Sequence, residues 1–118
     1  MASASETIRS AVLDWPGVRS GPHQFGAVEF TIGGREIGHL HGNTLLDVPF
    51  PRAVREELVA AGLAAPHRFL PDSGWVSFRI RHADDVKAAI ALLRRSYDLI
   101  TMQLERRAVQ NAAAKARV

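Results

Sequence analysis

Alternation of apolar and polar residues predicts short strands, because successive side chains on a strand point to opposite faces. Two consecutive glycines, Gly33-Gly34, follow the first alternating run, and this spacing is typical of a two-residue β-hairpin. A turn at Gly42-Asn43 then leads into a further strand. We therefore expect strands at residues 27–32, 35–41, 44–48 and 75–81.

The hairpin also predicts which residues face one another across its two strands. If the loop consists of the two glycines alone, Phe30 faces Ile37 and Val28 faces His39. Residues two apart on a strand share a face, so His39 and His41 are expected to point the same way. In this register that face also carries Val28, Phe30 and Ile37, and the two imidazoles lie at the edge of an apolar surface.

Apolar residues spaced by threes and fours predict three helices. Ser3 and Glu6 form a capping box for the first helix, which is expected to end near Asp14. The second helix is expected at residues 52–61, and Asp84 is expected to cap the last one. An amphipathic stripe runs along the last helix as far as Leu104. A helix continuing to residue 116 would be roughly 45–50 Å long at about 1.5 Å per residue.

These elements predict an α+β fold, since strands and helices do not alternate as in a parallel βαβ protein. The expected architecture is a two-layer sandwich, with one antiparallel sheet of about four strands and helices on one face. The order of elements is similar to that of the small double-wing and frataxin-like folds. With 118 residues, 47% of them hydrophobic and 23% charged, the chain is expected to form a single domain, 1–118. Residues 105–118 are expected to be a projecting helical tail, which could alternatively pack on a second copy and give a homodimer.

The composition excludes several classes of site. The chain has no cysteine, so disulfides, thiolate metal sites and cysteine nucleophiles are excluded. It shows no signal peptide and no run of 18 apolar residues, so no membrane span and a cytoplasmic location are expected. The net charge is +3. One basic cluster lies near the C-terminus, at Arg94, Arg95, Arg106, Arg107, Lys115 and Arg117.

That cluster supports an alternative function as a nucleic-acid or protein interaction module. No aromatic residues interleave with these basic residues, which argues against stacking on single-stranded nucleic acid.

The segment Gly38-His39-Leu40-His41-Gly42 carries the strongest candidate chemistry. One hypothesis is acid–base catalysis, in which His39 or His41 moves a proton and Asp47 orients the ring. A second hypothesis is a metal site, with the two histidines joined by Asp47 or His67 as a third ligand. A bare histidine pair is also compatible with packing and hydrogen bonding alone, so the sequence leaves these alternatives open.

Further candidates lie downstream and would bind a substrate. His67, Asp72 and Ser73 belong to a loop expected at residues 64–74, where Asp72-Ser73-Gly74 also has the composition of a simple turn. Trp75 opens the following strand among polar neighbours and could stack on a ligand. Arg52, in the first turn of the second helix, could reach an anion, although a solvated surface is the alternative.

Several segments together resemble the luciferase-like domain family, which takes its name from the fungal luciferases and includes many small bacterial proteins of unknown function. The resemblance covers residues 15 to about 100. Its most specific marks are His39-Leu40-His41-Gly42 and Pro71-Asp72-Ser73-Gly74-Trp75, with Leu46-Asp47-Val48-Pro49-Phe50 between them.

Fungal luciferases oxygenate a hydroxylated pyrone with molecular oxygen. The resemblance therefore implies a small-molecule oxygenase acting on an aromatic or lactone-type substrate, with no cofactor and no metal. The expected lining is His39, His41, Asp47, His67, Asp72 and Trp75.

Overall fold

One six-stranded antiparallel sheet organises the molecule, and the computed structural model describes it within residues 2–117. Met1 and Val118, the two ends of the expected domain and tail, lie outside the described residues. The strand order across the sheet is β1-β2-β3-β4-β6-β5. The strands are β1 (Arg19–Pro22), β2 (Val28–Ile32), β3 (Arg35–His41), β4 (Leu45–Pro49), β5 (Ala65–Pro66) and β6 (Trp75–Arg79).

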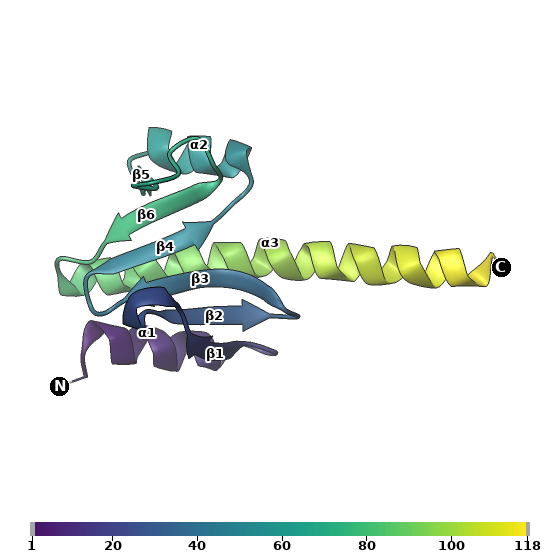
Figure 1. Cartoon of the computed structure of the whole chain (residues 1–118), viewed down its shortest axis with the longest axis horizontal. Coiled ribbons are helices and arrows are strands. Elements are labelled where there is room, and N and C mark those ends of the chain that lie inside the picture. The colour runs from purple at the N-terminus through teal and green to yellow at the C-terminus, as the bar shows by residue number, and fades with distance from the viewer. Residues whose placement is uncertain (1, 118) are drawn as a thin grey trace.

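Three α-helices accompany the sheet, and they confirm the expected α+β class with a long C-terminal helix. They are α1 (Ala4–Leu13), α2 (Arg52–Ala60) and α3 (Ala83–Ala116), with a short 3₁₀ helix η1 (Gln24–Gly26) between β1 and β2. Helix α3 runs behind the sheet, α1 packs beside it, and α2 lies at the β5–β6 edge (Figure 1). Ser3 caps α1 as predicted, since the Glu6 amide donates to Ser3 Oγ at 3.1 Å, but the reciprocal half of the capping box differs: Glu6 Oε1 accepts from the Ser3 hydroxyl at 3.1 Å instead of from the Ser3 amide.

The hydrophobic core fills the space between the sheet and the helices α1 and α3. Leu40 on β3 faces Leu46 on β4, and Val48 on β4 faces Val76 on β6, so neighbouring strands contribute a continuous apolar surface. Removing such side chains from water is the main stabilising contribution to the fold. The largest fully buried apolar side chains are Phe30, Ile8, Ile37, Leu40, Leu46, Leu58, Leu93, Val12, Val48 and Val76.

A β-bulge in the first hairpin changes the register that the sequence predicted. Thr31 pairs with Glu36, but Phe30 pairs with Gly38, so Ile37 is an extra residue on β3. The predicted pairs of Phe30 with Ile37 and of Val28 with His39 are therefore wrong. The carbonyl of the extra residue is not left unpaired, because the buried Ser96 Oγ on α3 donates to it at 2.8 Å.

The bulge also changes which side chains share a face of the sheet. Phe30 and Ile37 belong to the core, and Val28 packs against it, so the expectation that they lie on the histidine face is wrong. The bulge shifts the alternation of side chains along β3 by one residue. Glu36 and His39 are three apart in the chain, yet both point to the face of the sheet opposite the core. A direct contact between their side chains, at 2.8 Å, shows that they share this face.

Three other differences from the sequence prediction are local. The sheet has two more strands than expected, because β1 and the two-residue β5 lie at its edges and carry no alternating pattern. Strand β5 lies within the segment 64–74 that was expected to be a loop. The capping carboxylate of α3 belongs to Asp85 and not to Asp84, since Asp85 Oδ2 accepts the amides of Arg81 and His82 at 2.7 and 3.0 Å.

The last part of α3 extends beyond the sheet (Figure 1). The helix has 34 residues, and the molecule measures 55 × 31 × 25 Å along its principal axes. From Glu105 onward every described side chain is exposed. Within residues 2–117, no helix combines the length and the apolar character needed to cross a membrane.

Candidate functional site

The buried carboxylate of Asp47 is the centre of a polar cluster on the sheet face opposite α3. Its side chain is 0% exposed, and an isolated charge so placed would be strongly destabilising. Hydrogen-bond donors from the two neighbouring strands, β3 and β6, and from the loop after β5 surround it and compensate for the lost water. We call these residues the Asp47 cluster: His39, His41, Asp47, His67, Arg68 and Ser77.

The two oxygens of Asp47 have different partners. Oδ1 accepts from Ser77 Oγ at 2.7 Å and from Arg68 Nη1 at 3.1 Å. Oδ2 lies 3.1 Å from Nε2 of both His39 and His41. It also lies 3.6 Å from His67 Nε2 and 3.4 Å from Arg68 Nη2. Three imidazoles thus present the same ring nitrogen to one oxygen atom.

The strand pairing explains why these side chains meet. His39 on β3 is directly opposite Asp47 on β4, and Asp47 is directly opposite Ser77 on β6. Directly opposed residues of an antiparallel pair point to the same face, so the three form a row across the sheet. His41 is two residues further along β3 and joins that face. The segment after β5 carries His67 over the same surface.

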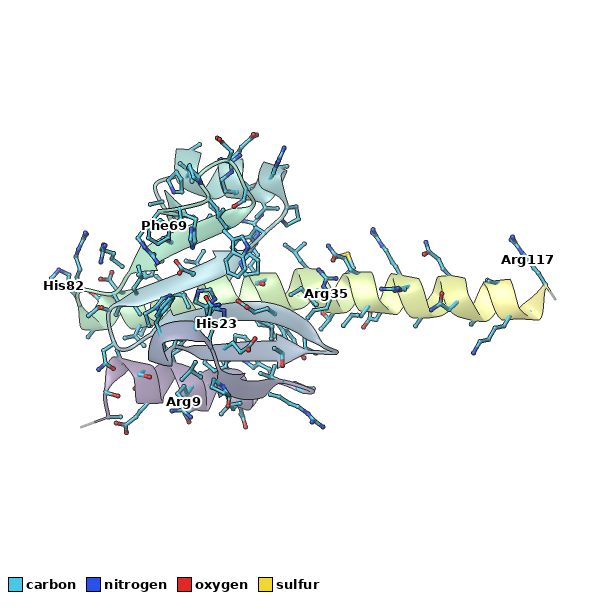
Figure 2. All side chains as sticks on the ribbon, viewed as in Figure 1. Arg9, His23, Arg35, Phe69, His82 and Arg117 are labelled. Atoms are coloured by element: carbon cyan, nitrogen blue, oxygen red, sulfur yellow. The ribbon has the colours of Figure 1, made fainter. Side chains whose placement is uncertain are left out.

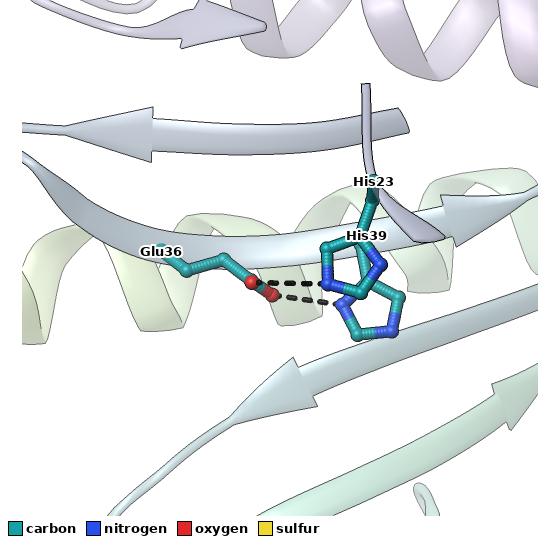
Figure 3. Close-up of side chains that lie close together, drawn as sticks. All are labelled: His23, Glu36 and His39. Carbon is teal, nitrogen blue, oxygen red and sulfur yellow. Dashed lines mark hydrogen bonds and ion pairs between the residues drawn. The ribbon is translucent and has the colours of Figure 1, made fainter. Parts of the chain in front are cut away.

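Glu36 and His23 extend the cluster on its other side (Figure 3). Glu36 Oε2 lies 2.8 Å from His39 Nδ1, and Glu36 Oε1 lies 3.6 Å from His23 Nε2. The His23 ring stacks on the His39 ring with centroids 4.0 Å apart and planes inclined by 14°. His39 is therefore held at both ring nitrogens by carboxylates and on one ring face by an imidazole.

These contacts shift the ionisation of the cluster. Burial by itself would lower the pKa of His39, but the hydrogen bonds and charges of Asp47 and Glu36 outweigh it and raise that pKa to about 9. Burial would raise the pKa of Asp47, yet hydrogen bonds from His39, Ser77 and Arg68 hold it well below its usual range. At neutral pH the pair is therefore an imidazolium beside a carboxylate.

His67 behaves differently from His39, because burial lowers its pKa. Its Nδ1 accepts the backbone amide of Phe69 at 3.2 Å, so the neutral ring carries its proton on Nε2. That Nε2–H points toward Asp47. His67 is thus a hydrogen-bond donor at the edge of the cluster.

Trp75 supplies an aromatic surface next to the imidazoles. Its ring centroid lies 5.3 Å from that of His39 and 6.1 Å from that of His67. Two grooves border the cluster without being lined by its imidazoles. One, of about 390 Å³, runs from Trp75 and Glu36 to helix α3, and the other, of about 490 Å³, runs from Arg68 and Ser77 toward the start of α3.

The structure brings together some of the predicted site residues and not others. His39, His41, Asp47, His67 and Trp75 lie together on one face of the sheet. Three of the expected substrate-binding residues lie outside the Asp47 cluster, namely Arg52, Asp72 and Ser73. Arg52 and Asp72 are exposed.

Ser73 has a structural role in the turn before β6. Its hydroxyl donates to the Leu70 carbonyl at 2.6 Å and accepts the Trp75 amide at 3.1 Å. These two contacts hold Trp75 at the start of its strand. Ser73 therefore influences the candidate site only indirectly, by fixing the backbone position of Trp75.

Sequence reasoning missed Glu36, His23 and Arg68 as members or neighbours of the cluster. Alternation alone places Glu36 on the face opposite His39, and only the bulge reverses this. Arg68 follows His67 directly, but nothing local shows that a loop folds back onto Asp47. Ser77 could have been predicted from the sequence, because it lies two residues after Trp75 on the same strand and so points to the same face.

The basic residues of the C-terminal helix are only partly available to a partner. Arg94 pairs with Asp98 at 3.0 Å and lies over the rings of Trp15 and Tyr97. Arg95 pairs with Glu57. The basic cluster expected from the sequence is therefore divided between intramolecular contacts and the exposed end of α3.

Comparison with known proteins gives one match. A family model described as Luciferase domain matches residues 34–96, which is more than half of the chain. No curated protein matches, and no solved structure matches. The matched segment begins at the β2–β3 hairpin and ends at Ser96, so it contains the whole Asp47 cluster, Glu36 and Trp75.

Proposed function

Because the chain belongs to the Luciferase domain family, we propose that it binds a small aromatic or lactone-type molecule and oxygenates it at the Asp47 cluster. The observation that carries this proposal is the convergence of three imidazole Nε2 atoms on one oxygen of a fully buried carboxylate. Such a concentration of ionisable groups is uncommon as packing alone and is typical of reaction centres. In this proposal His39, His41 and Asp47 form the reaction centre.

The surroundings of the cluster support a planar substrate. Trp75 offers a ring face for stacking beside the imidazoles of His39 and His67. The substrate would enter on the side of His41, whose side chain is 27% exposed while that of His39 is 9% exposed. His39 and Asp47, which are more buried than His41, would then contact the substrate from the surface of the sheet.

The reaction would add molecular oxygen, which is the oxidant, to a substrate carbon. The deprotonated ring would supply the electron pair of the new carbon–oxygen bond, and the terminal oxygen would take up a proton to give a hydroperoxide. A hydroxylated ring is a suitable substrate because loss of its proton makes the neighbouring carbon electron-rich. The cluster can promote this step either by accepting the proton at an imidazole or by binding the ring oxygen to a metal ion. The cationic partners around Asp47 would stabilise the anion that forms.

The test measures binding and oxygen consumption in the same samples. The protein is titrated with hydroxylated lactones and phenols while its histidine and indole NMR signals are followed, and oxygen uptake is recorded with an electrode. We expect shifts of the His41 and Trp75 signals and oxygen uptake with at least one compound. Replacement of His41 by Gln should abolish the uptake.

The control is Arg9→Gln, because Arg9 is exposed on α1, which packs against α3 (Figure 2). It should retain both binding and uptake. Equal uptake by the His41 and Arg9 variants would contradict the proposal, as would the failure of every compound to bind.

A further inference from the structure

Three metal-ligating atoms lie close together in the Asp47 cluster. His39 Nε2, His41 Nε2 and Asp47 Oδ2 all lie within 4.8 Å of one another, and each nitrogen is 3.1 Å from the oxygen. A transition metal ion with bonds of about 2.0–2.2 Å holds its ligand atoms roughly 3–3.5 Å apart. The observed spacings to Asp47 Oδ2 therefore match those around a bound ion.

Hydrogen bonding alone does not account well for this arrangement. A carboxylate oxygen has about two lone-pair sites, yet three groups lie within hydrogen-bond distance of Asp47 Oδ2, namely Nε2 of His39, Nε2 of His41 and Nη2 of Arg68. The oxygen thus has more donors than it can accept from. A metal ion between the atoms would displace the Nε2 proton of His39, bind the Nε2 lone pairs of His39 and His41, and so remove the excess of donors.

The residues around these three atoms support metal binding. Metal-ligating histidines usually donate their second ring N–H to a carboxylate, which fixes the ring and its tautomer. His39 makes this contact through Nδ1 to Glu36 at 2.8 Å. The other oxygen of Asp47 is held by Ser77 at 2.7 Å, so Oδ2 is the oxygen turned toward the imidazoles.

We propose that His39 Nε2, His41 Nε2 and Asp47 Oδ2 bind one divalent transition metal ion. Two imidazoles and one carboxylate form the ligand set of non-haem iron oxygenases, which leave open positions for substrate and oxygen. Zinc accepts the same donors. His67 is not a ligand, because its Nδ1 accepts the Phe69 amide and its Nε2 keeps a proton.

The charges of the site favour an anionic substrate once the ion is bound. Asp47 and Glu36 contribute two negative charges, Arg68 contributes one positive charge, and the ion contributes two. The net charge of the bound site is therefore +1, and a phenolate or enolate would neutralise it. The inference rests on the proposed function only for this choice of substrate, since metal binding is measured without any substrate.

The first experiment measures metal binding directly. The full chain is stripped with a chelator and titrated with Zn²⁺ by calorimetry and with Co²⁺ by visible absorption. We expect one ion per chain, micromolar or tighter affinity, and cobalt bands typical of a low-symmetry site. Absence of saturable binding by the unaltered protein overturns the proposal.

Variants then identify the ligands. His41→Ala and Asp47→Asn should weaken binding by more than Glu36→Gln, for which the loss of an outer partner predicts about 10- to 100-fold. His41 is part-exposed, so its variant is expected to fold even if the Asp47 variant does not, and circular dichroism checks this. His82→Ala serves as the unaffected control.

The variant His23→Ala distinguishes the proposed metal site from a second candidate site next to it. His23, Glu36 and His39 form a second set of ligand atoms that share His39 with the first. If His23→Ala abolishes binding while His41→Ala does not, the ion occupies that second set and the proposal is wrong. If the stripped and the loaded protein take up oxygen equally, a part of the bound ion in the reaction is overturned while the oxygenase proposal stands. Loading with Fe²⁺ or Zn²⁺ under argon before oxygen is admitted separates a redox role of the ion from a purely structural one.

Discussion

The side chain of Asp47 holds the candidate site together. It accepts hydrogen bonds from β3, β6 and the loop that follows β5, so it fixes the positions of elements that are far apart in the chain. Buried charges are tolerated when every oxygen has partners, as here. The same residue therefore matters for stability and for any chemistry at this surface.

Replacing Asp47 by Ala should lower the free energy of unfolding by about 3 kcal/mol, because the change leaves Arg68, Ser77 and the imidazoles without their acceptor. Urea denaturation of the metal-free protein measures this. The exposed Asp72 is the control, and Asp72→Ala should change the value by less than about 0.5 kcal/mol. Equal losses in the two variants would show that Asp47 is not a centre of stability.

Asp85 gives a prediction about pH. Its carboxylate accepts the backbone amides of Arg81 and His82, and these hydrogen bonds lower its pKa. Because the pKa is lower in the folded state, the stabilisation is present above the unfolded value of about 4 and is lost as pH falls further.

Asp85→Ala should therefore have a lower thermal midpoint than the unaltered protein at pH 7, and the difference should shrink below about pH 4. Midpoints measured by circular dichroism between pH 2.5 and 7 check this. A difference that stays constant over the whole range would mean that the carboxylate does not cap α3.

At the scale of elements, the bulge in β3 is the decisive feature. It places Ile37 in the core and turns Glu36 to the side of His39. Helix α3 holds it from behind, because Ser96 donates to the Ile37 carbonyl and Leu93 packs against Gly38. The geometry of the candidate site thus depends on a helix that contributes no residue to it.

Gly38→Ala should destabilise the protein by about 1–3 kcal/mol, because a Cβ there would lie 2.7 Å from Leu93 Cδ2 and 2.9 Å from the Asp47 carbonyl oxygen. Gly21→Ala in β1 is the matched control, since nothing lies within 4 Å of the corresponding position. Denaturation curves compare the two. A harmless Gly38→Ala would mean that α3 can move away from the sheet without loss.

At the scale of the whole molecule, the C-terminal part of α3 stands apart from the rest. Its described side chains are exposed from Glu105 to the end of the described chain, whereas Tyr97 and Ile100 further back are buried. Burial of apolar surface against the sheet stabilises only the first part of this helix.

Deletion of residues 106–118 should therefore change the thermal midpoint by less than about 2 °C. Sedimentation measurements on both forms test whether the tail joins two copies of the chain. A fall in both midpoint and mass would show that the tail forms a dimer interface and is not simply exposed.

Much of this structure was predictable because it follows from local patterns. The four alternating or hairpin-linked strands, the three helices and the Ser3–Glu6 cap depend on residues within a few positions of one another. The shared face of His39 and His41 follows from the two-residue period of a strand alone. The amphipathic stripe ends near Leu104, and every described side chain from Glu105 onward is exposed.

Only the tertiary structure determined which residues surround Asp47. Its partners Ser77 and Arg68 are 30 and 21 residues away along the chain. A local sequence pattern cannot predict contacts between residues so far apart in the chain. The edge strands β1 and β5 form because neighbouring strands offer free hydrogen-bonding groups, so their own sequences show no alternation. The bulge depends on contacts with α3, which lies some 60 residues further along the chain. The sequence thus determined the elements and the histidine pair, while packing between distant segments decided the register and hence the site.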